Sequence, residues 1–187
     1  TTALRSARSG PAIEAGQALG FSQGFGSLGL HIGYEAAPGV ALGVFGQYQY
    51  APLGFTNVHL YSGGVEAVIE TGPFEIEAQL GYHTYRPAPA NTVINAGLKG
   101  YYDLSDAWSL SAGADYFLID GTQPLYQVAL GLRYTFADDF FLEAGYAHTY
   151  EPLTGTSIGG IGFRFAKTFG RGATFSGRDI VSTVGSW

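Results

Sequence analysis

Apolar and polar residues alternate along most of this chain with a period of two. Between residues 74 and 83, Phe74, Ile76, Ala78, Leu80 and Tyr82 fall on one side, and Glu75, Glu77, Gln79, Gly81 and His83 fall on the other. Successive side chains of a β-strand point to opposite faces, so this pattern predicts strands with one apolar face and one polar face. Ten such segments occur, at about 12–22, 26–35, 39–50, 57–70, 73–85, 92–103, 107–117, 125–136, 139–150 and 157–167.

The connections between these segments alternate in length. Short links rich in Pro, Gly, Asp and Ser occur at 36–39, 71–73, 104–107 and 137–139, and longer links occur at 51–57, 86–91, 118–124 and 151–157. Such short links are typical of tight turns between antiparallel strands. Ten strands joined in this way would most simply close into an up-and-down barrel, because closure removes the open edges of the sheet.

The polar face is the better candidate for the interior of such a barrel. Gly, Ser and Gln dominate it, and these side chains fit a small lumen better than large apolar side chains do. Charged residues make up 13% of the chain, about half the usual share, so the polar face is a poor match for a soluble surface. The apolar face has almost no charge in the middle of its strands, as lipid contact would require.

Aromatic residues on the apolar face form two groups, one near each end of the strands. The turn-side group is Tyr34, Phe74, Tyr102, Trp108, Tyr134, Phe136, Phe140 and Phe165, and the loop-side group is Tyr48, Tyr61, Tyr82, Tyr116, Tyr126 and Tyr146. Phe74 and Tyr82 would be roughly 26 Å apart along a strand, or about 19 Å across a membrane after a ~45° tilt. The spacing favours two belts of interfacial aromatics, and hence membrane lipid as a partner.

With these features, the chain resembles small bacterial outer-membrane β-barrels in the style of the OmpA transmembrane domain and OmpX. The segment "YYDLSDAWSLSAGADY" (101–116) is similar to a strand, periplasmic turn and strand of that class, and "GGIGFRF" (159–165) is similar to a closing strand. Those relatives have eight strands, so eight is the alternative to the ten counted here. The resemblance implies the outer membrane of a diderm bacterium, with the short turns and both chain ends in the periplasm.

Two motifs that could indicate catalysis or ligand binding are better explained structurally. Residues 24–29 match G-x-G-x-x-G, but a dinucleotide site needs a helix after the motif, and a strand pattern follows. The four histidines, His31, His59, His83 and His148, lie on different segments without metal-ligand spacing. Neither an enzyme nor a cofactor is therefore expected. His83 and His148 both precede Thr-Tyr, yet Ala147 shifts the second copy by one residue and should place the two rings on opposite faces unless a bulge restores the phase.

The polar face contains an acidic cluster around the link at 71–73. It consists of Glu66, Glu70, Glu75 and Glu77, and a symmetric hairpin would set Glu70 opposite Glu75. Like charges opposed across a strand pair are destabilising. The cluster should therefore need either a cation, with a divalent ion as the candidate, or the basic lumen residues Lys99, Arg133 and Arg164. The first reading predicts a cation-preferring constriction, and the second predicts a network of ion pairs.

Charge also separates the chain into three parts. Residues 1–11 and 166–187 together have a net charge of +4, whereas the part between them has −10. We therefore expect an N-terminal periplasmic segment (1–11), the barrel (12–167) and a basic C-terminal tail (168–187) that can dock into the acidic lumen or onto another envelope protein. The overall net charge of −6 argues against nucleic acid as a partner.

These patterns favour a structural or interaction role in the cell envelope, in which the protein could be a subunit of a larger complex. A barrel of this size has a lumen largely filled by side chains, which disfavours a wide pore. The first alternative is a narrow cation-preferring pore for small solutes. The second alternative is a soluble lipocalin-like carrier, which would have the apolar face inside.

Overall fold

The computed structural model of the protein describes the backbone of residues 10–19, 24–53, 56–86, 92–137 and 140–167. It describes side chains within 30–50, 58–86, 92–136 and 140–163. Ten strands account for these residues: β1 (Gly10–Leu19), β2 (Gly24–Ala37), β3 (Val40–Leu53), β4 (Thr56–Thr71), β5 (Phe74–Arg86), β6 (Thr92–Asp103), β7 (Trp108–Ile119), β8 (Gln123–Ala137), β9 (Phe140–Glu151) and β10 (Thr156–Lys167). No helix in this part of the chain is long and apolar enough to cross a membrane.

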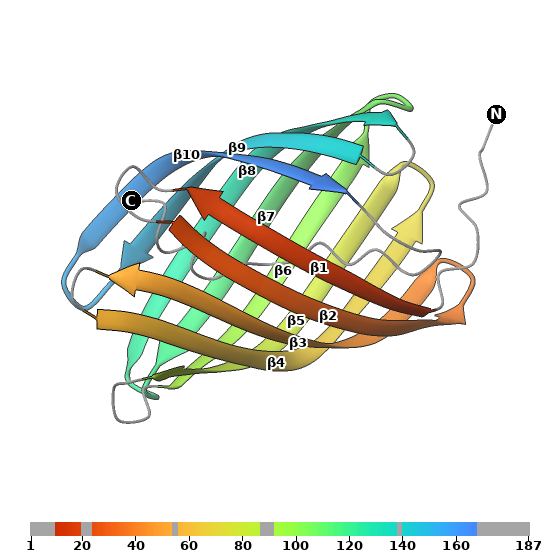
Figure 1. Ribbon diagram of the computed structural model, residues 1–187. Helices are drawn as coiled ribbons and strands as arrows, with labels where there is room; N and C mark the ends of the chain where they lie inside the picture. Colours follow the sequence, from red (N-terminus) through yellow and green to blue (C-terminus); the bar gives the residue numbers. More distant parts are fainter. Residues whose placement is uncertain (1–9, 20–23, 54–55, 87–91, 138–139, 168–187) are drawn as a thin grey trace.

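Each strand pairs antiparallel with the next, in the order β1 to β10, so the predicted up-and-down topology and strand count are confirmed. Figure 1 shows that this single sheet curves into a barrel with strongly tilted strands. In the described backbone the ladders run from β1 to β10, and none joins these two outermost strands. Register shifts occur between Glu35 and Ala37 in β2 and between Thr135 and Ala137 in β8, next to the turns that follow these strands.

The predicted links at 51–57 and 118–124 are wrong in length, because the strands continue into them. Pro52 pairs with Asn57, and Leu118 pairs with Pro124. Only residues 120–122 separate β7 from β8, and positive φ angles at Asp120 (50°) and Gly121 (69°) allow the chain to reverse there. We call the end of the barrel where β1, β3, β5, β7 and β9 end the loop end. The opposite end, where β2, β4, β6 and β8 end, is the turn end.

The apolar face of the strands points outward. On β5, the side chains of Leu80 and Tyr82 are 53% and 52% exposed, whereas Glu77 and His83 on the other face are 5% and 2% exposed. The same alternation leaves large apolar residues exposed around the wall, including Leu30, Val44, Val65, Leu98 and Leu130. An apolar patch of this extent is far larger than monomeric soluble proteins show. The soluble lipocalin-like alternative, which requires the opposite orientation, is therefore wrong.

Candidate functional site

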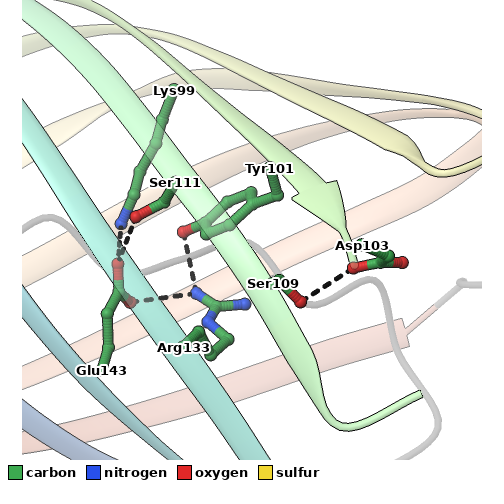
Figure 2. A network of polar contacts seen from close by, with 7 residues as sticks. All are labelled: Lys99, Tyr101, Asp103, Ser109, Ser111, Arg133 and Glu143. Carbon is green, nitrogen blue, oxygen red and sulfur yellow. Dashed lines mark hydrogen bonds and ion pairs between the residues drawn. The ribbon is translucent and has the colours of Figure 1, made fainter. Parts of the chain in front are cut away.

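The lumen near the turn end contains an ionic network centred on Glu143 of β9 (Figure 2). Oε1 of Glu143 accepts hydrogen bonds from Lys99 Nζ and Ser111 Oγ, each at 3.0 Å. Oε2 lies 3.2 Å from Nη2 of Arg133, which also donates to the hydroxyl of Tyr101 at 2.8 Å. One carboxylate therefore binds side chains from β6, β7 and β8.

Aromatic rings complete this network. The Arg133 guanidinium lies over the rings of Tyr101 and Phe141, with 4.2 Å from Cζ to each ring centroid. The Lys99 ammonium lies 4.9 Å from the Tyr101 centroid. Ring faces attract cations, and the attraction is stronger where water is excluded. The two cations are therefore stabilised by the rings as well as by Glu143.

A glycine on the lumen face makes room for the network. A Cβ atom at Gly131 would lie 2.5 Å from Ser111 Oγ and 3.3 Å from Glu143 Oε1. Both distances are too short for an ordinary contact, so a larger residue would displace the hydroxyl and press on the carboxylate. The abundance of glycine on the polar face thus has a specific cause here: side chains from neighbouring strands lie across the glycine.

Two further hydrogen-bonded groups fill the middle of the lumen. His31 Nδ1 lies 2.9 and 3.0 Å from the two carboxylate oxygens of Glu66, and its ring stacks on Phe45. His83 is held on both sides, with Nδ1 2.6 Å from Ser62 Oγ and Nε2 2.6 Å from Asn95 Oδ1. His83 and Asn95 are almost fully buried. These imidazoles are fixed in position by their neighbours in the packed interior.

Near the loop end, the lumen face of β4 to β8 contains an apolar cluster, which the sequence did not predict. Leu60, Val93 and Phe117 are 1%, 1% and 3% exposed and pack together, with Tyr85, Ile119 and Leu125 around them. The register places Val93 opposite Ile119 and Phe117 opposite Leu125 on the lumen face. The strands extend beyond the aromatic belt toward the loop end. There, apolar side chains face the lumen and pack into a small core. We call this group the apolar plug.

The four predicted acidic residues do not form one site. Glu70 faces Glu75 across the β4–β5 hairpin, as the sequence predicts. Glu66 instead binds His31, and Glu77 lies opposite Lys99 in the register. Among the described residues, no group of three or more His, Asp or Glu side chains is arranged to hold a metal ion.

Two of the predicted basic residues form ion pairs with a carboxylate outside the predicted acidic cluster. Lys99 and Arg133 both form ion pairs with Glu143, a residue that sequence reasoning missed. Register could have revealed it, because Arg133 lies directly opposite Glu143 in the β8–β9 hairpin. Arg164 of β10 is directly opposite Glu143 in the β9–β10 ladder, but its side chain lies outside the part described.

The predicted interface aromatics lie on the outer surface in cross-strand pairs. Ring centroids are 4.9 Å apart for Phe74 and Tyr102 and 4.6 Å apart for Trp108 and Tyr134. Ring contacts also join Phe136 to Phe140, Tyr48 to Tyr61, and Tyr116 to Tyr126. The remaining members, Tyr34, Tyr82 and Tyr146, are exposed on the same face. The side chain of Phe165 lies outside the described part.

The two histidines of the repeated motif lie on opposite faces, as the one-residue offset predicts. His83 is in the lumen, whereas His148 is on the outer face with its ring stacked on Tyr146. The β8–β9 and β9–β10 ladders pass His148 without a register shift, so no bulge restores the phase. The repeated motif is therefore not a paired imidazole site.

Comparisons with known proteins give the fold. No protein-family model matches the chain, and a search of curated proteins finds no match. Among solved structures, the anion-selective porin from Comamonas acidovorans is 10% identical with a TM-score of 0.52, over 84% of this chain and 59% of that one. In-vitro folded OmpT, an outer membrane protein of Vibrio cholerae, is 13% identical with a TM-score of 0.52, over 87% of this chain and 65% of that one.

A loop-deletion form of the same OmpT is 17% identical with a TM-score of 0.52, over 84% of this chain and 58% of that one. This chain thus spans less than two thirds of the length of the solved structures that it resembles. At these identities the likeness shows the fold, which is that of an outer-membrane β-barrel. Together with the apolar exterior, this fold places the protein in an outer membrane. The particular likeness to OmpA and OmpX is not established by these matches.

Proposed function

We propose that this protein is an outer-membrane barrel whose lumen is closed to solutes, with a structural or interaction role in the envelope and without enzymatic activity. The observation that supports this role is that mostly buried side chains pack on the lumen face at two separate heights, in the ionic network and in the apolar plug. A filled lumen is expected for a small barrel. The likeness to OmpA and OmpX is proposed only for the filled lumen, because those relatives have eight strands and the described residues of this chain form ten.

The apolar plug is one barrier to solute passage. Its three central side chains are almost fully buried, so little room for water is left between them. Moving a hydrated ion into such a region costs far more than thermal energy, because the side chains of Leu60, Val93 and Phe117 cannot replace its hydration shell. The ionic network is a second barrier of different character, since Lys99, Ser111 and Arg133 from three strands converge on one carboxylate of a fourth strand.

Planar-bilayer recording tests the closed lumen. Wild-type protein should give no stable channel openings. A variant with Leu60→Ala and Phe117→Ala lacks most of the plug, and Glu143→Gln lacks the centre of the ionic network. Each change alone should leave one barrier in place, and conductance should appear only in the combined variant. Stable openings of the wild-type protein would contradict the proposal.

The second candidate function is a narrow cation-preferring pore, favoured by the carboxylates on the lumen face. Glu70 and Glu75 lie opposite each other near the turn end, and Glu66 and Glu77 lie deeper. If the lumen opens, this excess of acid should favour cations. Reversal potentials under a KCl gradient measure the preference, and a permeability ratio near one would exclude this function. A divalent-cation site at Glu70 and Glu75 would also raise the melting temperature when Mg²⁺ is added.

An interaction role needs a partner, which we assign to the loop-end connections or to the basic tail. The tail (168–187) lies outside the described residues, and the proposal rests on its charge. A pull-down from native membranes in mild detergent, with and without residues 168–187, tests this assignment. Loss of a co-purifying envelope protein on deletion of the tail would support it. An unchanged set of co-purifying proteins would direct attention to the loop end.

A further inference from the structure

The outer face of the barrel has a single described cation, Arg86. The structure describes three Lys or Arg side chains, and two of them, Lys99 and Arg133, are in the lumen. Arg86 is exposed at the loop end of β5 and follows the alternation of Tyr82, so it lies on the lipid face. By the same alternation, the described carboxylates lie on the lumen face of the strands or in turns. Arg86 therefore has no acidic neighbour on its own face within the described strands.

Arg86 lies in a row with two other polar side chains of the outer face. The register sets it directly opposite His59 of β4, and His59 is directly opposite Tyr50 of β3. Directly opposed side chains have Cβ atoms about 4.5–5.5 Å apart, so three hydrogen-bonding groups lie side by side across three strands. We call Tyr50, His59 and Arg86 the loop-end row.

Tyrosine contacts fix the orientation of the His59 ring. The Tyr48 hydroxyl lies 2.8 Å from His59 Nδ1, and the two rings stack with centroids 6.0 Å apart. The Tyr50 ring also packs against the imidazole, at 5.4 Å between centroids. When Tyr48 donates its hydroxyl proton to Nδ1, the ring proton is on Nε2, which then remains as a donor. The row thus presents N–H groups of a histidine and an arginine side by side.

The height of the row matches the headgroup layer of a bilayer. His59 is two residues beyond Tyr61, which belongs to the loop-side aromatic belt. Two residues advance about 7 Å along a strand, or about 5 Å along the membrane normal after a ~45° tilt. The headgroup layer on each side of the hydrocarbon core is about 5–7 Å thick. A cation at this height faces lipid phosphates.

We propose that the loop-end row binds the phosphate group of a lipid headgroup. The Arg86 guanidinium supplies the positive charge and several N–H donors in a planar fork that suits phosphate oxygens. His59 Nε2 supplies a further donor, and the Tyr50 hydroxyl supplies another at the edge of the row. In an outer membrane, the phosphate could come from the phosphorylated glycolipid of the outer leaflet or from a glycerophospholipid.

Native mass spectrometry of the full chain in a neutral detergent tests the site, with lipid A as the first probe and phosphatidylglycerol as the second. Arg86→Ala should weaken binding of whichever lipid occupies the site by about tenfold, as expected for the loss of a charge-assisted hydrogen bond. His59→Ala should weaken binding by a smaller factor, and Arg86→Lys should retain part of the affinity. Tighter binding of lipid A than of phosphatidylglycerol would identify the glycolipid as the source and place the loop end outside the cell; the reverse order would identify the phospholipid.

His148→Ala is the matched control. His148 also lies on the outer face of a strand that ends at the loop end, and its Nδ1 is 3.3 Å from a tyrosine hydroxyl. Its cross-strand neighbours are Val128 and Gly159, so it has no adjacent cation. Folding of each variant is verified by heat-modifiable gel mobility. Equal lipid binding by Arg86→Ala and wild type, or an equal loss in His148→Ala, would overturn the proposal. Binding of inorganic phosphate alone, abolished by Arg86→Ala, would assign the row to a free anion instead.

Discussion

The Nζ atom of Lys99 on β6 lies 3.0 Å from Oε1 of Glu143 on β9, so this ion pair joins strands that are not neighbours in the sheet. Both side chains are mostly buried, with exposed fractions of 19% and 10%. The contact therefore stabilises the curvature of the wall and not merely one hairpin. Its removal should affect the folding of the barrel as a whole.

Glu143→Gln should destabilise the barrel substantially. The change leaves the charges of Lys99 and Arg133 in the lumen without the carboxylate that neutralises them. Breaking a buried ion pair by removing one partner costs about 3–5 kcal/mol, so we expect the free energy of unfolding to fall by about 3 kcal/mol. Urea unfolding in lipid vesicles, followed by tryptophan fluorescence, measures it.

Glu151→Gln provides the control for this change. Glu151 is also on β9, but its partners Gln123 and Thr154 are neutral donors at the rim of the barrel. The same substitution there should cost less than about 1 kcal/mol. Equal losses at the two positions would mean that the charge of Glu143 has no special role.

Gly81→Ala should disrupt the buried histidine in the middle of the lumen. A Cβ atom at this position would lie 2.4 Å from Asn95 Oδ1 and 3.1 Å from His83 Nε2. The added methyl group must push these two side chains apart, and overpacking of this kind costs about 1–3 kcal/mol. The midpoint of urea unfolding should fall accordingly. Gly46→Ala, whose Cβ would meet nothing closer than 4.0 Å, should leave the midpoint within error of wild type or raise it.

Leu130→Arg should report directly on contact with lipid. Leu130 is at the centre of β8 and is 67% exposed, so in a membrane it faces the middle of the bilayer. An arginine there should lower the free energy of unfolding in vesicles by roughly 2–4 kcal/mol. Leu153 is equally exposed at 67%, but it lies in the turn between β9 and β10. Leu153→Arg should therefore have almost no effect, and similar effects at both positions would argue against a bilayer around the strands.

Sequence alone predicts most of the wall of this barrel. Alternation identifies all ten strands, and the choice of outward face follows from where charge and aromatics fall, as Leu80 and Glu77 illustrate. It also predicts local cross-strand pairs such as Glu70 with Glu75, because a tight turn fixes which residues lie opposite each other.

Contacts across the lumen are beyond this kind of reasoning. Whether Lys99 reaches Glu77 on the next strand or Glu143 three strands away depends on strand tilt and stagger, which no local pattern encodes. The apolar plug was missed for a related reason. Leu60 and Val93 alternate in phase with polar lumen residues. A rule that assigns one polar face to each strand therefore predicts no apolar cluster at these positions.

The glycines of the lumen face have a consequence for how this sequence can vary. A Cβ atom at Gly81 or Gly131 would come within 2.5 Å of the side chain of Asn95 or Ser111 respectively, so each glycine and the side chain that covers it occupy one shared volume. Neither member of such a pair can be enlarged while the other is kept. In related sequences, a bulky residue at one of these glycine positions should therefore be accompanied by a smaller residue at its partner. The interior of the barrel should evolve by paired exchanges, while single apolar substitutions accumulate freely on the exterior.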